Sequence, residues 1–332
     1  MRARLSDIAR HAGVSEATVS RVLNDRPGVG ASTRQAVLTA LDVLGYERPA
    51  ALRQHSAGLI GLVVPELENP IFPLFAQAIS TELSAGGYTP VLCTQSPGGV
   101  TEDEYVEMLR ERRVAGIVFV SGLHADTTAD PGRYSKLADS GLPLVFVNGY
   151  VDELPSPCFS ADDAIAATLG VEHLVSLGHR RIGLISGPER FVPVQRKRSG
   201  YVEAMSGVGE PLVELTMFGV EGGAAAAARL LDAGATGIIC GSDLMALGAI
   251  REARSRGMAI PGDVSIVGYD DSPLIGYTDP PLTTVRQPAR AMSIAAVRAL
   301  LDEIAGQAVP STEYLFRPEL VVRSSTGAAP NT

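Results

Sequence analysis

One short stretch near the N-terminus carries side chains whose chemistry suits the edges of DNA bases. Arg21 can donate two parallel hydrogen bonds to a guanine, Ala17 can contact the methyl group of a thymine, and Glu16 can accept from a cytosine. Hydroxyl and amide groups near the start of a helix suit phosphate oxygens, which fix the register of a protein on the duplex. The DNA contacts that we expect in this part of the chain are Ser6, Ser15, Glu16, Ala17, Thr18, Ser20, Arg21, Asn24 and Thr33.

Two short helices joined by a tight turn are needed to position these side chains. Ser6 is expected to cap the first helix and Ser15 the second, and Gly13 between them tolerates the left-handed backbone of a sharp turn. Apolar residues at helical spacing give each helix one buried face: Ile8, Ala9 and Ala12, then Val19, Val22 and Leu23. The pattern predicts a helix-turn-helix whose second helix enters a DNA major groove. The alternative is an ordinary helical hairpin with a solvated polar face.

The charge of the chain is unevenly distributed. Residues 1–55 hold eight Arg and five Asp or Glu, a charge of +3, and the remainder holds 20 basic and 32 acidic residues, a charge of −12, which together give the net −9. A basic head on an acidic body concentrates affinity for DNA in the head. At 332 residues the chain is long enough for two or three domains with sizeable cores.

The rest of the composition gives no indication of a cofactor, a metal or a membrane. Cys93, Cys158 and Cys240 lie far apart, mostly in apolar runs, and no pair has the spacing of metal ligands. We therefore expect three small buried hydrophobes in a reducing compartment. The N-terminus has no apolar signal region, and no segment approaches about 18 continuous apolar residues, so we expect a soluble, cytoplasmic protein.

The motif around the expected turn is specific enough to suggest a family. The runs Asp7-Ile8-Ala9, Gly13-Val14-Ser15 and Thr18 to Asn24 closely resemble the DNA-binding headpiece of the lactose/galactose-repressor (LacI/GalR) family of bacterial transcription regulators. The resemblance implies a third helix that is capped by Ser32 or Thr33 and ends near Gly45-Tyr46. Its expected buried residues are Val37, Leu38, Leu41 and Leu44, and residues 1–46 then form a three-helix headpiece.

Residues 47–57 follow as a hinge or linker. In the family this segment forms a helix on operator DNA, packs against its dimer mate and pushes a leucine into the minor groove, which bends the DNA. Here Pro49 suits a first helical turn, but the position of the wedge leucine falls at His55, and Leu52 is the nearest apolar candidate. Either Leu52 acts in a shifted register, or the DNA is bent less, or the segment is a plain linker.

From residue 58 onward, apolar strands alternate with amphipathic helices, which predicts two parallel α/β lobes. The expected strands are Leu59–Val64, Thr89–Thr94, Gly116–Val120 and Leu144–Val147, then Ile182–Ser186, Val213–Phe218, Gly237–Cys240 and Ser265–Val267. The tail segments Thr283–Arg286, Arg290–Ala305 and Tyr314–Val322 are expected to cross back between the lobes. We place lobe one at about 58–157 plus 286–314, lobe two at about 158–285 plus 315–326, and a tail at 327–332.

The body of the chain extends the resemblance. His173 to Ile182, Ser242 to Gly248, Val267 to Asp271 and Pro280 to Val285 are similar to family motifs, so the resemblance covers residues 3 to about 325. It implies an α/β fold in which a helix-turn-helix headpiece precedes a two-lobed core like that of a periplasmic binding protein. Such proteins bind a small molecule in the cleft, at the carboxyl ends of the strands.

The family's effector contacts can be transferred to this sequence residue by residue. Asp243 matches an aspartate that suits paired ligand hydroxyls or an amine, and its simpler role is a helix cap. Phe218 falls in the segment that holds the family's stacking aromatic, and Phe72 matches an aromatic of the first lobe that lines the cleft. Further effector contacts are expected where strand ends meet the cleft, at Asn148, Asp162 and Gln287.

Lys197 departs from the family pattern. The family has an arginine three residues before a Gly-aromatic pair, here Gly200-Tyr201, and its planar fork grips hydroxyls or a carboxylate. Lysine is a point charge, so bidentate recognition is lost. Arg190, Arg196 or Arg198 could substitute, and the run could also be a solvated basic surface.

The resemblance implies a homodimeric repressor without a cofactor, bound to a pseudo-palindromic operator in double-stranded DNA. A small molecule, best guessed to be a sugar or related polyol, changes the operator affinity from the cleft. The C-terminal tail has no leucine heptads, so a dimer is expected rather than a tetramer. A periplasmic-type solute carrier is the alternative, but it has no headpiece. No phosphate loop, nucleophile elbow or zinc-spaced His pair supports an enzyme.

Overall fold

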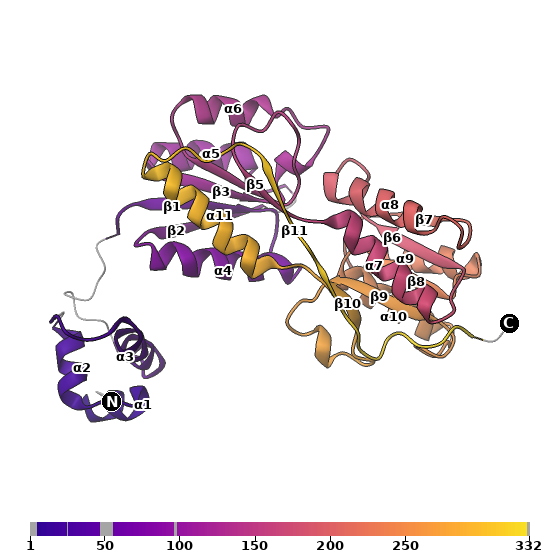
Figure 1. The fold of residues 1–332 in the computed structure, drawn as a ribbon, viewed down its shortest axis with the longest axis horizontal. Helices are drawn as coiled ribbons and strands as arrows, with labels where there is room; N and C mark the ends of the chain where they lie inside the picture. The colour runs from indigo at the N-terminus through magenta and orange to yellow at the C-terminus, as the bar shows by residue number, and fades with distance from the viewer. Residues whose placement is uncertain (1–4, 25, 47–55, 96–97, 331–332) are drawn as a thin grey trace. The chain divides into compact units, whose positions relative to one another are not determined.

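The computed structural model of the protein describes residues 5–24, 26–46, 56–95 and 98–330. These residues form two compact units, one within residues 1–57 and one within residues 58–332 (Figure 1). In its described part, the first unit contains the expected three helices, α1 (Leu5–Ala12), α2 (Glu16–Leu23) and α3 (Ala31–Val43). The expected hinge helix, with Leu52 and His55, lies outside the described residues and stays a prediction.

A small apolar core joins the three helices. The buried residues that face one another in it are Ile8, Ala9, Val19, Val22, Val37, Ala40 and Leu41. Gly13, between α1 and α2, has a φ of 66°, which is the left-handed conformation that the sharp turn requires. Most of the residues that the helical spacing indicates are therefore buried in this core. The expected Ala12, Leu23, Leu38 and Leu44 are only half-buried against it, and Ala40 is buried although it was not expected.

The helix caps agree only in part with expectation. Ser15 caps α2, because its hydroxyl accepts from the backbone N–H of Thr18 at 3.2 Å. The prediction that Ser6 caps α1 is wrong, since the helix already includes Leu5. The prediction for α3 is also wrong: its cap is Gly30, so Ser32 and Thr33 lie inside the first turn. Glycine is itself acceptable at a cap, so a nearby hydroxyl residue need not mark the helix start.

The first lobe of the second unit is built on one parallel sheet. Its strand order is β11-β5-β4-β3-β1-β2. The strands are β1 (Leu59–Val64), β2 (Thr89–Thr94), β3 (Gly116–Val120), β4 (Leu144–Val147), β5 (Cys158–Ala161) and β11 (Glu313–Phe316). The helices that cover them are α4 (Ile71–Ala85), α5 (Glu102–Glu111), α6 (Gly132–Asp139) and α11 (Ala289–Ile304).

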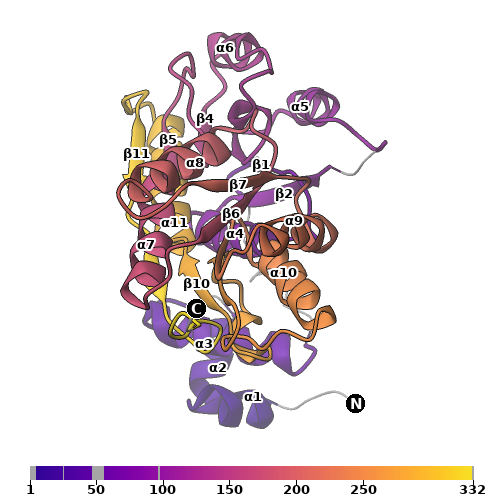
Figure 2. The same cartoon turned by 90° about the vertical axis from the view of Figure 1, so that its right-hand side faces the viewer.

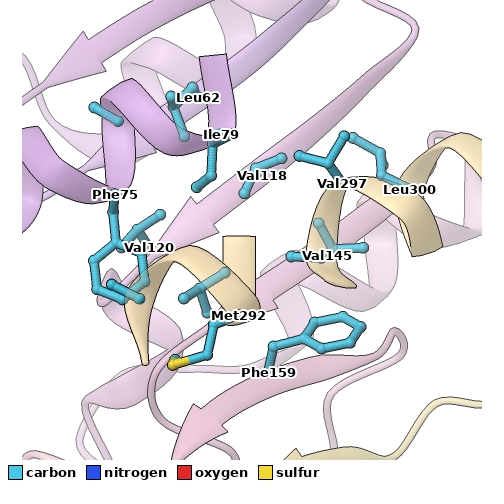
Figure 3. Packing of buried hydrophobic residues seen from close by; sticks show 14 of the residues in the cluster. Leu62, Phe75, Ile79, Val118, Val120, Val145, Phe159, Met292, Val297 and Leu300 are labelled. Atoms are coloured by element: carbon cyan, nitrogen blue, oxygen red, sulfur yellow. The ribbon is translucent and has the colours of Figure 1, made fainter. Parts of the chain in front are cut away.

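Alternate residues of these strands pack on opposite faces of the sheet. Val118 and Val145 lie in one core with α4 and α11, and Figure 3 shows Phe75 and Met292 of these helices in that core. Ile117, which is next to Val118 in β3, lies in a second core with α5 and α6. Because both of their faces are buried, the central strands β1, β3 and β4 are continuous apolar runs, as is usual for parallel sheets.

The second lobe repeats the same plan with one difference. Its strand order is β12-β10-β9-β8-β6-β7, and all neighbours are parallel except β12 and β10. The strands are β6 (Ile182–Ser186), β7 (Leu212–Leu215), β8 (Gly237–Cys240), β9 (Ser265–Asp270), β10 (Thr283–Arg286) and β12 (Glu319–Val321). The helices are α7 (Asp163–Ser176), α8 (Val192–Ala204), α9 (Val220–Asp232) and α10 (Asp243–Ser255). One buried cluster involves α9 and α10, and the other involves α7 and α8.

Within residues 98–330 the chain passes between the two sheets three times: between β5 and α7, between β10 and α11, and between β11 and β12. Figure 2 shows the late strand β11 beside the much earlier β5, and α11 near α4 in the same lobe. Each lobe is thus completed by segments from the C-terminal part of the chain.

Several details of the lobes differ from the sequence-based expectation. The strand β7 ends at Leu215 and not at Phe218, and β9 continues to Asp270 and not only to Val267. The strand Cys158–Ala161 pairs with β4 and β11, so lobe one extends to 161 and not to 157. The expected single run Tyr314–Val322 is two short strands in different sheets, separated by Arg317 and Pro318. Proline removes a backbone donor, which favours a break in the ladder at this point.

In the parts of the chain that the structure describes, the helices are too short or too polar to cross a lipid bilayer.

Candidate functional site

The expected DNA-contacting residues of α2 lie on its surface. Glu16, Ala17, Arg21 and Asn24 are exposed, whereas the buried side of the helix is formed by Val19 and Val22. Thr18 and Ser20 are half-buried, and Ser15 shares a hydrogen bond of 2.9 Å with the Thr18 hydroxyl. The polar groups that suit base edges and phosphates therefore share the accessible side of a capped helix.

Two of these side chains are held by nearby backbone carbonyls. Arg21 donates from Nη2 to the carbonyl of Pro27 at 2.5 Å, and Asn24 donates from Nδ2 to the carbonyl of Ser20 at 2.8 Å. A contact of DNA with Nη2 of Arg21 or with Nδ2 of Asn24 competes with these carbonyls, whereas the other polar atoms of both side chains are not used by them. Ser6 and Thr33 are half-buried in the first turns of α1 and α3, and whether they contact DNA stays a prediction.

A cavity of about 380 Å³ lies between the two lobes of the second unit. Strand carboxyl ends surround it, and Ser121, Asn148 and Asp270 there have positive φ angles of 46°, 60° and 118°. Such conformations are uncommon for non-glycine residues and cluster at ligand sites. Six of the eight expected effector-binding residues line the cavity: Phe72, Asn148, Arg190, Lys197, Phe218 and Gln287.

Asp243 and Asp162 do not line the cavity, contrary to expectation. Asp243 is 0% exposed, and its carboxylate accepts from the backbone N–H and hydroxyl of Ser272 at 2.8 and 2.6 Å and from the Thr284 hydroxyl at 2.7 Å. Burial raises its pKa to about 6. Asp162 caps α7 by accepting from the backbone N–H of Ile165 at 3.0 Å. Both carboxylates bind protein groups that hold local structure together.

A buried carboxylate that the sequence analysis did not select takes the central place. Asp270, 3% exposed at the end of β9, accepts from Gln287 Nε2 at 2.6 Å and from Asn69 Nδ2 at 3.5 Å. Asn148 in turn donates to Gln287 at 3.4 Å. Burial raises the pKa of Asp270 well above its usual range, because it penalises the charged form. Its position at the carboxyl end of a buried strand is the sequence signal that could have identified it.

Lys197 lies in a second buried group. It is 8% exposed, forms an ion pair with Asp163, and its ammonium lies 3.9 Å from the centre of the Tyr269 ring. The Tyr269 hydroxyl donates to the same Asp163 oxygen at 2.9 Å. Lys197 is therefore not part of a solvated basic surface, and its charge is balanced inside the protein.

The three arginines that could replace the family's arginine differ in position. Arg196 forms two hydrogen bonds with Glu313, at 2.6 and 2.9 Å, and Arg198 pairs with the exposed Glu189. Neither lines the cavity, whereas Arg190 does. Among these candidates, only Arg190 is positioned to reach a bound molecule.

The mouth of the cavity is bridged between the lobes. Arg190 Nε lies 2.9 Å from Asp126 Oδ2, and the Arg190 carbonyl accepts from both the backbone N–H and the hydroxyl of Thr127 at 2.8 Å. Asp126 and Phe191 also form an isolated β-bridge. Phe218 lies beside this bridge with its ring 6.0 Å from that of Phe191 and is 51% exposed, so part of the residue is open to a bound molecule.

Comparison with known proteins gives matches over the whole chain. The model of bacterial regulatory proteins of the lacI family matches residues 4–49, and that of the periplasmic binding protein-like domain matches residues 171–326. The transcriptional regulator MalR of Streptomyces coelicolor is 60% identical over 338 residues, covering 99% of this chain and 98% of its own.

Solved structures agree with these matches. The structure of the transcriptional regulator CelR with cellobiose has a TM-score of 0.72 and 30% identity, covering 98% of this chain and all of its own. The lac repressor dimer bound to operator and the anti-inducer ONPF has a TM-score of 0.71 and 30% identity, covering 99% and 100%.

Proposed function

This chain belongs to the lacI family of bacterial regulatory proteins, and we propose that it is a repressor whose operator affinity is changed by a sugar or related polyol in the cavity between its lobes. Membership in the family makes the chain a DNA-binding transcription regulator and not an enzyme. It also decides against the solute-carrier alternative, because the headpiece is part of the match. The repressor role and the ligand class are the proposed part.

One observation carries the proposal: polar groups from both lobes line a single cavity and are bonded to one another across it. Asn69 of lobe one reaches Asp270 of lobe two, and Asp126 of lobe one reaches Arg190 of lobe two. A molecule that replaces or supplements these bonds changes the free energy of lobe closure. Effectors of this kind typically change DNA affinity by about 1–3 kcal/mol.

Uncharged hydroxyl-rich ligands suit the groups around the cavity. Asn148 and Gln287 offer amide donors and acceptors, and the exposed ring of Phe218 offers a face on which a sugar can stack. The relative CelR was solved with cellobiose, which supports the same class of ligand here.

For the DNA side, we propose a homodimer on a pseudo-palindromic operator, with one α2 in each half-site. The lac repressor structure, a dimer on operator DNA, supports this arrangement. Arg21 releases the Pro27 carbonyl and donates to a base edge, while the hydroxyl groups of Ser15 and Thr18 contact phosphates.

Titration of the full-length protein with fluorescent DNA from upstream of its own gene tests the proposal. We expect a specific complex that weakens with salt by about one logarithmic unit per phosphate contact and per tenfold change in salt. We expect a neutral sugar such as cellobiose, maltose or ribose to release that complex. Binding that ignores DNA sequence, or a specific complex whose affinity no sugar of the panel changes, contradicts the proposed function.

A further inference from the structure

The cationic side chains of the cavity already have carboxylate partners. Among the described residues that line it, the cations are Lys197 and Arg190. Lys197 is paired with Asp163, and Arg190 Nε lies 2.9 Å from Asp126 Oδ2. A negatively charged ligand therefore meets cations whose charge is balanced before it arrives.

Of these two cations, Lys197 is the less accessible to a bound anion. Its ammonium is directed to Asp163 and lies 3.9 Å from the centre of the Tyr269 ring, and the whole side chain is nearly buried. The Tyr269 hydroxyl holds the same Asp163 oxygen, so three groups fix one another. An anion can gain little from this ammonium, because it competes with a buried carboxylate that is already in place.

The remaining charge of the cavity wall is negative. Among the described residues, the carboxylates that line it are Glu66, Asp126, Asp163 and Asp270. Four carboxylates against two cations give a formal charge of −2. With Asp270 in its neutral form, which burial favours, the balance is still −1. Like charges at short range in a poorly solvated site repel strongly.

We infer that this cavity selects uncharged ligands and rejects those that carry a phosphate or carboxylate group. The inference rests on the proposed function, since it concerns the effector of the same cavity. The groups left to recognise such a ligand are amides and a ring, for example Asn69, Asn148, Gln287 and Phe218. The charge pattern thus narrows the effector to a neutral sugar or polyol and excludes its phosphorylated form.

Calorimetric titration of the full-length protein with matched pairs tests the inference. The pairs are ribose with ribose 5-phosphate, and maltose and cellobiose each with its 6′-phosphate. We expect at least one neutral member to bind and its phosphate to bind at least about tenfold more weakly. A phosphate that binds more tightly than its neutral partner, or a panel in which no neutral member binds, overturns the inference.

The variant Asp163→Asn makes the cause testable. It keeps the shape of the side chain and an acceptor for Tyr269 while it frees the charge of Lys197. We expect the ratio of phosphate to neutral affinity to rise by about tenfold or more. The matched control is Glu189→Gln, which frees Arg198. Arg198 is on helix α8 like Lys197 but does not line the cavity, so the ratio of phosphate to neutral affinity should stay unchanged.

A second variant keeps the test decisive if Asp163→Asn does not fold. Asp126→Asn frees Arg190 at the mouth, and the affinity ratio cancels any general loss of lobe closure because it affects both members of a pair. A ratio that stays at the wild-type value in the folded variant contradicts the inference.

Operator binding separates this inference from the proposed function. If a sugar phosphate releases the operator, the regulator role stands and the inference is overturned. If no specific operator complex forms, the proposed function fails, and the calorimetric ratios still decide the selectivity of the cavity.

Discussion

The α2 surface and the inter-lobe cavity hold their polar side chains in opposite ways. On α2 the groups are exposed, and their partners are close in sequence: Arg21 donates to Pro27, and Asn24 to Ser20. In the cavity most of the polar groups are buried, and partners such as Asn69 and Asp270 are 201 residues apart. The first set can change partners without disturbing the fold, whereas the second set helps to hold the lobes in place.

The largest effect is expected where a buried polar group outside the cavity is removed. Asp243→Ala leaves the Ser272 and Thr284 donors unpaired, so lobe two should lose about 3–5 kcal/mol of stability. Thermal unfolding of the full-length protein measures this loss. An unchanged unfolding temperature together with a lost sugar response would instead restore Asp243 as a direct effector contact.

The stability of lobe two should also depend on pH, because Asp243 is buried there. Burial raises the pKa of Asp243 from its usual value near 4 to about 6, so its stabilising contribution is present below pH 4 and is lost as the pH rises through 6. Asp243→Asn cannot ionise, and its stability relative to wild type should rise by about 3 kcal/mol over that interval. Denaturant unfolding at a series of pH values measures the difference, and parallel curves would contradict it.

On the α2 surface a single substitution should change affinity but not stability. Arg21→Ala removes an exposed side chain, so the unfolding temperature should stay constant while operator binding weakens by about 1–3 kcal/mol per half-site. Operator titration and thermal unfolding of the same preparation check both parts. Lower stability with unchanged affinity would show that Arg21 supports the Pro27 loop instead.

The smallest effect is expected at the helix cap. Ser15→Ala removes the acceptor for the Thr18 N–H and should destabilise the headpiece by about 1 kcal/mol, with no change in the lobes. Hydrogen exchange resolves the two units in the intact chain: protection should fall for the amides of Val19 and Val22 and stay constant in β1. Ser15→Asp, which keeps an acceptor, serves as the control.

The strands that are buried on both faces could be predicted from the sequence, because a continuous apolar run has few alternatives. Leu59–Val64, Gly116–Val120 and Ile182–Ser186 were predicted with the observed bounds. Cys158–Ala161 was missed because it follows β4 without a helix between them, so it breaks the alternation of strands and helices on which the prediction rests.

The site was harder to predict, because an aspartate at the start of a helix looks the same whether it binds a ligand or the protein. Asp243 and Asp162 match the expected pattern, yet both accept from the protein. Asp270 lies in the motif Val267 to Asp271, but its role depends on hydrogen bonds from Asn69 and Gln287. Only the fold brings these two residues close to Asp270. Lys197 was recognised as unusual, but its partner Asp163 could not be identified from the sequence.

The three passages of the chain between the sheets have a consequence during protein synthesis. The helices α1 to α3 are complete once residue 46 has left the ribosome, but lobe one lacks its edge strand until residue 316, and the cavity lacks Gln287 for nearly as long. Domains form as their residues emerge. A nascent or prematurely ended chain therefore carries a finished three-helix headpiece while its ligand-binding part is still incomplete, so the headpiece exists for a time without the part that responds to an effector.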